Sequence, residues 1–197
     1  MLEEKKLKEA EKRVKQYISE GIIKTKVKAE HTSFFLKNAD DSIDSAKALY
    51  DISTDAEKQK FLGFTSFNGL LWTVNASYYS MFYMARALLE HEGIKIKTDI
   101  SIHSITFDTI VSQFYLTGKL QKELFDDFIE AKEDAIELLG KQKADELIEE
   151  YFYEKNKRST FTYEMGEILV KSKAKTSLER AQKFRREIKK IIEKNKK

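Results

Sequence analysis

The sequence predicts an all-α protein, an up-and-down bundle of about six or seven helices, and three observations predict it. The chain has 197 residues, of which none is proline and seven are glycine, so little in it interrupts a helix. Hydrophobic residues make up 41% of the chain, which is enough to form a buried core. Apolar residues recur along most of the length at intervals of three and four, the spacing of an amphipathic helix. We therefore expect one helical domain covering residues 1–197.

The N-terminal third contains two amphipathic patterns followed by a predicted loop. Leu2 to Glu20 places apolar residues at helical spacing, and Gly21 is a natural helix stop. Ser33 is positioned to cap a second helix, because its hydroxyl can accept a hydrogen bond from a free backbone N–H of the first turn. The segment from Asp51 to Phe67 is predicted to be a loop, since glycine and small polar residues punctuate it.

The longest apolar pattern follows this loop. Asn68 is predicted to cap a central helix that ends at Gly93 and is apolar on nearly every face, which places it in the middle of the bundle. Three further segments have helical patterns: Ser101 to Tyr115, closed by Gly118; an acidic stretch from Gln121 to about Glu154, interrupted near Gly140; and Ser177 to Lys194.

The net charge of +3 conceals a strong asymmetry along the chain. From Lys155 to Lys197 there are 15 Lys or Arg against 5 Asp or Glu, whereas residues 1–154 hold 21 against 28. A basic segment of this kind can bind the phosphates of nucleic acid. Alternatively, it lies against the acidic helix of the same bundle. The sequence leaves both interpretations open.

Several classes of site are excluded by residue types and spacing. The chain has no cysteine, which excludes disulfides and thiolate metal sites. The glycines are too scattered for a phosphate-binding loop of backbone amides. None of the three histidines has a glutamate three residues before it, as a di-iron bundle requires. An acidic helical face is expected to be solvated surface: Asp126, Asp127, Glu130, Asp134 and Glu137. We predict no metal and no cofactor.

Targeting signals give a default location. No apolar segment of signal-peptide type follows Met1, and no apolar run approaches 18 residues. We therefore expect a cytoplasmic protein that does not span a membrane.

One polar stripe on the central helix is the first candidate for function. At 100° per residue, Asn75, Tyr79 and Arg86 fall within about 40° of one another. Polar groups on a buried helix need partners. Two interpretations remain open: a buried polar network that joins helices of the bundle, or the lining of a binding groove.

Three segments resemble the HEPN family, small helical domains named for nucleotide binding in higher eukaryotes and prokaryotes. FFLKNADDSIDSAKALY, residues 34–50, is similar to the first core helix of that family. WTVNASYYSMFYMARALLEHEGI, residues 72–94, resembles its long second helix and is the most specific of the three. His103, followed by Ile110, Phe114, Gly118 and Leu120, matches the histidine, apolar helix and glycine turn of one subgroup. The resemblance covers residues 33–163 and leaves an N-terminal amphipathic helix, 1–30, and a basic C-terminal helix, 164–197, outside it.

The resemblance implies a bundle that often forms homodimers and binds RNA or a nucleotide. Many members are metal-independent ribonucleases, including toxins that pair with a minimal nucleotidyltransferase antitoxin. Their catalytic motif is an arginine followed, after four to six residues, by a histidine. Arg158 is the matching arginine here, but Tyr163 occupies the histidine position. Tyrosine, with a pKa near 10, is a poor base at neutral pH, whereas His103 is the nearest alternative imidazole.

These residues lead to three hypotheses. The first is a HEPN-like domain that binds nucleic acid or nucleotide beside a nucleotidyltransferase-type partner, with its own nuclease activity weak or lost. Its groove would be lined by these residues: Asn75, Tyr79, Arg86, His103, Arg158 and Tyr163. The second is an active ribonuclease toxin that uses Arg158 with His103 or Tyr163. The third is a protein-interaction or dimerisation module without a nucleic-acid role.

Overall fold

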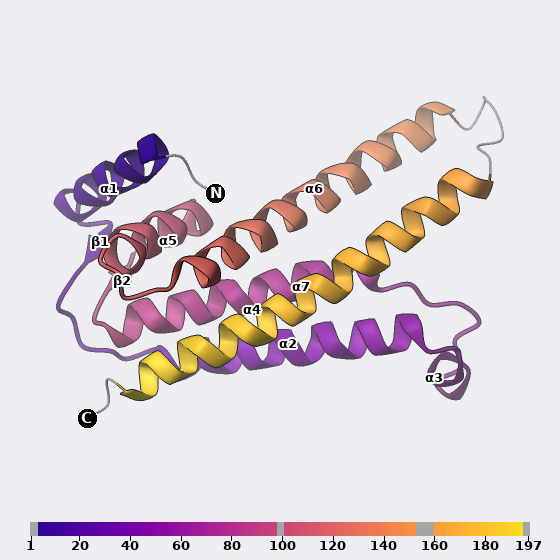
Figure 1. Cartoon of the computed structure of the whole chain (residues 1–197), viewed down its shortest axis with the longest axis horizontal. Coiled ribbons are helices and arrows are strands. Elements are labelled where there is room, and N and C mark those ends of the chain that lie inside the picture. Colours follow the sequence, from indigo (N-terminus) through magenta and orange to yellow (C-terminus); the bar gives the residue numbers. More distant parts are fainter. Residues whose placement is uncertain (1–3, 98–100, 153–159, 195–197) are drawn as a thin grey trace.

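The computed structural model describes the backbone of residues 4–97, 101–152 and 160–194, and within these the side chains of 4–97, 101–138 and 170–194. These residues form seven α-helices, one π-helical turn and two short strands (Figure 1). In chain order the elements are α1 Glu4–Ser19, β1 Ile23–Lys24, α2 Thr32–Thr54, α3 Ala56–Phe61, α4 Leu70–His91, β2 Lys95–Ile96, α5 Ile102–Ile110, η1 Val111–Tyr115, α6 Lys122–Phe152 and α7 Thr160–Lys194. The predicted all-α fold is confirmed. None of the helices in the described residues has the length and apolar character needed to cross a membrane.

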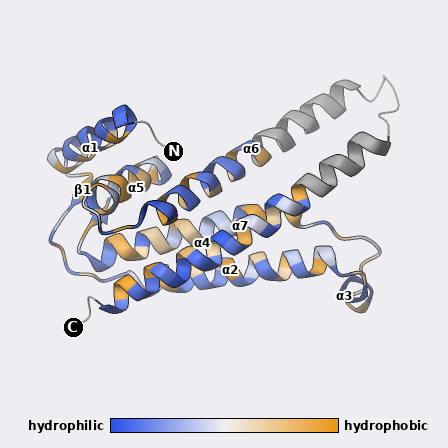
Figure 2. Cartoon of the chain, in the orientation of Figure 1, coloured by the Kyte–Doolittle hydropathy of each residue, from blue (hydrophilic) through white to orange (hydrophobic). Residues whose placement is uncertain are grey.

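Helix α4 is the central helix of the bundle. It packs against α2, α7 and α6, and α2 also contacts α7 (Figure 1). Most of its residues are buried, and Figure 2 shows it paler and more apolar than the largely hydrophilic ribbons of α1, α6 and α7. A helix that is apolar on nearly every face is stable in water only where neighbouring helices cover it. The prediction of a central helix near residues 68–93 is confirmed.

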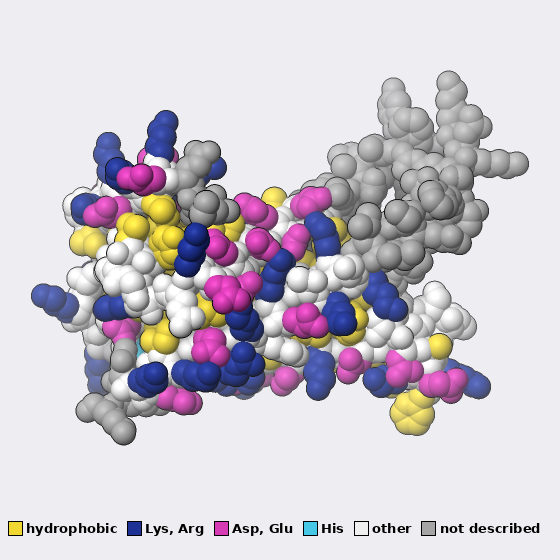
Figure 3. Space-filling view, in the orientation of Figure 1, with side chains coloured by type: hydrophobic (Ala, Val, Ile, Leu, Met, Phe, Trp, Pro, Cys, Tyr) yellow, Lys and Arg dark blue, Asp and Glu magenta, His cyan; other side chains and the backbone are white. Residues whose placement is uncertain are grey.

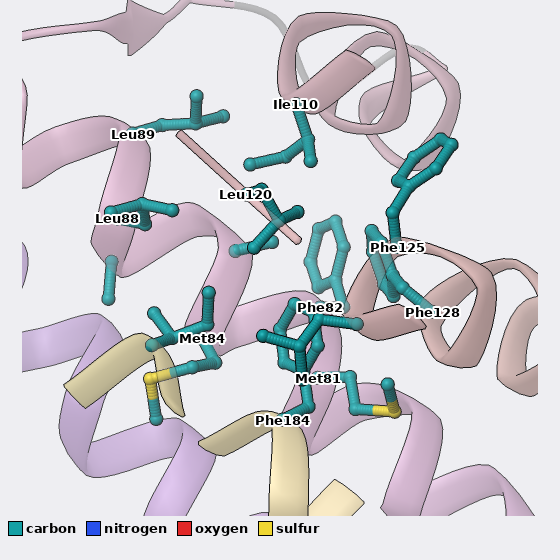
Figure 4. Close-up of a cluster of buried hydrophobic side chains, with 14 of the residues drawn as sticks. Met81, Phe82, Met84, Leu88, Leu89, Ile110, Leu120, Phe125, Phe128 and Phe184 are labelled. Atoms are coloured by element: carbon teal, nitrogen blue, oxygen red, sulfur yellow. The ribbon is translucent and has the colours of Figure 1, made fainter. Parts of the chain in front are cut away.

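The core is filled by large side chains from three of these helices. Met81 and Met84 of α4 lie close to Phe184 of α7, which is fully buried (Figure 4). The ring centroid of Phe184 is 5.4 Å from that of Phe128 of α6. Unbranched methionine side chains fill the irregular space beside such rings. This cluster is what joins α4, α6 and α7.

The cap of α2 differs from the prediction. Ser33 lies inside the helix. The N-cap is His31, and its side chain makes no capping hydrogen bond. Instead the carboxylate of Glu90, only 3% exposed, accepts hydrogen bonds from the backbone N–H of Glu30 at 3.1 Å and of His31 at 3.2 Å. A negative charge is favourable at this end of a helix. The capping carboxylate comes from α4, and Glu90 is 59 residues from His31 in the sequence. The sequence around the start of α2 therefore does not reveal this cap.

The predicted loop between residues 51 and 67 is wrong in its first half. Helix α2 continues to Thr54, and Asp55 then caps the short helix α3 by accepting hydrogen bonds from two backbone N–H groups, each at 3.1 Å. Asn68 is one residue before the N-cap of α4, Gly69, although its side-chain oxygen accepts a hydrogen bond from the N–H of Leu70. Asp55 thus provides the side-chain N-cap that the sequence predicted at Ser33 and Asn68.

The two C-terminal helices differ from the prediction, one in its continuity and the other in its start. Helix α6 continues through Gly140 without interruption, and α7 begins at Thr160 rather than at Ser177. One glycine inside a helix costs only about 1 kcal/mol, which many neighbouring helix-forming residues offset. The expected boundary at residue 164 falls inside α7.

The basic face of α7 pairs with acidic groups of the same molecule. Lys173 and Lys183 each bridge two carboxylates of α6, at distances between 2.6 and 3.0 Å. Arg180 forms ion pairs with three carboxylates of α6, two of which also pair with these lysines. The amine of Lys189 is 2.9 Å from a carboxylate oxygen of Asp40 of α2. Figure 3 shows the two signs of charge interleaved over this face. The acidic face of α6 is therefore largely ion-paired, and five of the ten Lys and Arg side chains described on α7 pair with carboxylates of α2 or α6.

Candidate anion-binding site around His103

His103 lies at the start of α5 and packs against aromatic side chains of α4. Its Nδ1 is 2.8 Å from the hydroxyl oxygen of Tyr78, a hydrogen-bonding distance. Its ring centroid is 4.1 Å from that of Phe82 and 5.7 Å from that of Tyr79. Tyr78 and Phe82 are buried, whereas His103 and Tyr79 are half-buried. The imidazole is thus held on one side and accessible on the other.

Two positive side chains act electrostatically on this imidazole. Burial lowers the pKa of His103, and the charges of Lys132 and Arg86 lower it further. A histidine whose pKa lies below its usual value of about 6.5 is neutral at pH 7. Burial raises the pKa of Tyr78, so its phenol keeps its proton. We call His103, Tyr78, Arg86 and Lys132 the His103 site.

The hydrogen bond with Tyr78 determines the role of the other ring nitrogen. When the phenol donates to Nδ1, the proton of the imidazole is on Nε2, which can then donate to a phosphate oxygen. When Nδ1–H donates to the phenol oxygen, Nε2 carries a lone pair and can accept a proton. Among the described residues, the contact with Tyr78 is the hydrogen bond that His103 makes.

The two cations are positioned by aromatic rings. The guanidinium carbon of Arg86 is 4.8 Å from the ring centroid of Phe35 of α2. The amine of Lys132 is 4.8 Å from the ring centroid of Phe107 of α5. Cation–π contacts of this kind hold a positive side chain against the face of a ring. Four helices, α2, α4, α5 and α6, therefore contribute to the surroundings of His103.

The structure brings together some of the residues that the sequence predicted. Tyr79, Arg86 and His103 lie close to one another. Asn75 shares their half-buried face of α4. Arg158 lies outside the described residues. Tyr163 belongs to α7, with its side chain outside the described set.

Sequence reasoning missed two members of the site. Tyr78 is buried, and its hydroxyl forms a hydrogen bond with His103. Lys132 was not singled out at all. Its signal was available, because it is a lysine in the middle of a helix segment that is otherwise strongly acidic. Of the other two histidines, His31 is exposed and His91 half-buried.

Comparisons of the chain with protein-family models, with curated proteins and with solved structures find no match. Within the part of the chain that the structure describes, no group of three or more metal-binding side chains is present. A groove of about 440 Å³ runs between α1 and η1, lined in part by Leu7, Ser112 and Leu116, and contains none of the predicted site residues. The chemistry of the His103 site is thus the feature from which a function can be argued.

Proposed function

We propose that the chain is a HEPN-like helical domain that binds RNA or a nucleotide by a phosphate group at the His103 site. In this proposal it acts in the cytoplasm beside a nucleotidyltransferase-type partner, and its own nuclease activity is weak or absent. The resemblance of residues 33–163 to the HEPN family supports the class of partner. The site itself supports the class of ligand.

One observation carries the proposal: two positive side chains from different helices lie near a half-buried imidazole that has a ring nitrogen to spare. Lys132 comes from α6 and Arg86 from α4, and both act electrostatically on His103. A phosphate would interact favourably with both charges and could accept a hydrogen bond from the imidazole.

We expect the double variant Arg86→Gln/Lys132→Gln to bind single-stranded RNA more weakly than the natural chain. Each phosphate contact contributes about 0.7 to the slope of log affinity against log salt, and the two side chains share one phosphate, so the slope should fall by about 0.7. Titration of a fluorescent RNA oligonucleotide at several salt concentrations measures it. Arg158→Ala is expected to act in the same direction, because the resemblance implies a phosphate contact for that residue.

A matched control is available on the outer face of α7. The variant Arg186→Gln/Lys190→Gln removes the same two charge types, and both residues pair with Glu187 on their own helix. If this control weakens RNA binding and the first variant does not, RNA binds to the basic tail and the proposal fails. If the natural chain binds no RNA and no nucleotide, the hypothesis of a protein-interaction module is favoured instead.

An active ribonuclease is the second candidate, and the state of His103 favours it. Its lowered pKa keeps the imidazole neutral at pH 7, the form that can take the 2′-hydroxyl proton. Nearby positive charge can stabilise the developing negative charge on phosphorus oxygens. Metal-independent RNA cleavage that is abolished by His103→Ala and changes its pH profile in Tyr78→Phe would establish this candidate.

We also propose that the chain forms a homodimer through the outer stripe of α4. Trp72, Ala76, Tyr79 and Tyr83 recur at intervals of three and four, which puts them on one side of the helix. Trp72 is 54% exposed, and the other three are half-buried, although neighbouring helices cover the rest of α4. Aromatic side chains at such positions are typical of interfaces. A second copy here would lie beside Tyr79, at the edge of the His103 site.

We expect Trp72→Glu to convert this dimer into a monomer at micromolar concentration, because a buried unpaired charge at the centre of an interface is strongly unfavourable. Light scattering coupled to size-exclusion chromatography measures the mass. Phe61→Glu is the control, since Phe61 is 89% exposed on α3, away from the stripe. A natural chain that is monomeric at all concentrations contradicts the dimer.

A further inference from the structure

Three lysines gather on the small β-ribbon that precedes α5. Strands β1 and β2 pair antiparallel, with Lys24 opposite Lys95 and Ile23 opposite Ile96 (Figure 1). The two isoleucines are buried, so the lysines point to the outer face. Lys97, two residues after Lys95, lies on the same side of the ribbon because side chains alternate along a strand. We call Lys24, Lys95 and Lys97 the lysine ribbon.

These positive charges are close enough to oppose one another. The proximity of Lys24, and to a lesser extent of Lys95, lowers the pKa of Lys97. Like charges opposite each other on paired strands are destabilising. In the described residues, Glu30 is the carboxylate that pairs with this group, 3.7 Å from Lys95. Two further lysines, Lys26 and Lys28, follow β1 and are exposed. The cluster therefore has an excess of positive charge that an anionic ligand would relieve.

The backbone beneath the lysines is held by tight contacts. The N–H of Val27 donates to the carbonyl of Gly93 at 3.1 Å, and the N–H of Lys97 donates to the carbonyl of Ile22 at 2.8 Å. Gly93 has φ +70°, and a Cβ there would be 2.8 Å from the carbonyl oxygen of Val27. Only glycine fits this position. Lys26 also has a positive φ, +57°, which is uncommon for a residue with a side chain. The lysines thus project from a defined surface.

The ribbon lies at the same end of α4 as part of the His103 site. Arg86 precedes Gly93 by seven residues, about 10 Å along a helix axis at 1.5 Å per residue. Lys95 follows two residues later, and β2 leads towards α5, which carries His103. An extended strand of nucleic acid with a phosphate at the His103 site is therefore within a few nucleotides of the ribbon.

We infer that Lys24, Lys95 and Lys97 form a second set of phosphate contacts, one for each lysine, with the backbone of the RNA strand whose phosphate occupies the His103 site. This inference rests on the proposed function and extends it, because it names a strand of several nucleotides, rather than a single nucleotide, as the ligand. Phosphate contacts of this kind position a nucleic acid without reading its sequence.

The test uses the full chain and single-stranded RNA. We expect Lys24→Gln/Lys95→Gln/Lys97→Gln to lower the slope of log affinity against log salt by about 2, for three contacts of about 0.7 each, and to weaken binding at about 0.1 M salt tenfold or more. The matched control removes three exposed lysines from the opposite end of α2 and from α3: Lys47→Gln/Lys58→Gln/Lys60→Gln.

A footprint on the natural chain makes the test independent of variant folding. Lysines are acetylated in limiting reagent, with and without RNA, and the modified peptides are quantified. RNA should protect Lys24, Lys95 and Lys97 and leave Lys47, Lys58 and Lys60 unchanged. No protection of Lys24, Lys95 and Lys97 by RNA would overturn the inference, as would equal protection of all six lysines.

The outcomes separate this inference from the proposed function. If the lysine-ribbon variant binds RNA as the natural chain does, while Arg86→Gln/Lys132→Gln is weakened, the inference fails and the proposed site remains. If the lysine-ribbon variant is weakened while Arg86→Gln/Lys132→Gln is not, the ribbon binds RNA and the proposed function of the His103 site fails.

Discussion

We expect Phe184→Ala to lower the free energy of unfolding by about 3–5 kcal/mol, the range for removing a buried phenylalanine. Phe184 has no exposed surface and lies between α4 and α6, with its ring 5.4 Å from Phe128. Its loss leaves a cavity where three helices meet, and close-packed neighbours fill such a cavity only in part. Urea denaturation followed by circular dichroism measures the change, at one fixed protein concentration because a dimer would add a dependence on concentration.

The same substitution on the surface is the control. Phe61→Ala removes an equal number of atoms from a side chain that is 89% exposed, so its effect should stay within about 0.5 kcal/mol. An effect of Phe184→Ala below about 1 kcal/mol, equal to that of Phe61→Ala, would show that α7 is not packed in the core as Figure 4 has it.

Spacing along the sequence was sufficient to predict the helices that build this core. Met81, Met84 and Phe184 belong to patterns with helical periodicity, and α4 is apolar on most sides, so its central place follows from burial alone. The errors concern helix ends. Gly140 and the polar segment before Ser177 indicated breaks in the helices. Both helices continue there, because the surrounding helix-forming residues favour the helix by more than one residue opposes it.

Contacts between distant segments could not be predicted from local pattern. Glu90 caps α2 from α4, and Asp40 of α2 meets Lys189 of α7. Neither pair has a sequence spacing that indicates contact. The same holds for the His103 site, where Tyr78 and Lys132 come from different helices. The rotation of 100° per residue was sufficient to predict that Tyr79 and Arg86 share one face of a helix. Their partners on other helices could be identified only from the folded structure.

We expect the ion pair between Arg13 and Asp108 to produce an asymmetric loss of stability when either member is removed. Nε and one terminal nitrogen of Arg13 donate to the two carboxylate oxygens of Asp108 at 2.7 and 2.8 Å, and this hydrogen bonding raises the pKa of Arg13. The pair holds α1 against α5. The Asp108 side chain is 6% exposed, whereas that of Arg13 is 45% exposed.

The difference in exposure decides which substitution is worse. Arg13→Met keeps the packing of the side-chain stem but leaves a buried carboxylate without its partner, for which we expect a loss of about 2–3 kcal/mol. Asp108→Asn keeps one acceptor for Arg13 and leaves a guanidinium that water can reach, so the loss should be about 1–2 kcal/mol. Asp40→Asn is the control for a half-exposed pair, with an expected loss of about 1 kcal/mol or less.

Urea denaturation of the three variants at pH 7 measures these losses, and proteolysis distinguishes local from global effects. Because the pair attaches α1 to the bundle, Arg13→Met should also make the residues of α1 accessible to protease before the bundle unfolds. A loss for Asp108→Asn equal to or greater than that for Arg13→Met would contradict the explanation, since it would mean that pairing matters more than leaving a carboxylate buried alone. Equal losses for all three variants would show that the burial of Asp108 has no energetic consequence.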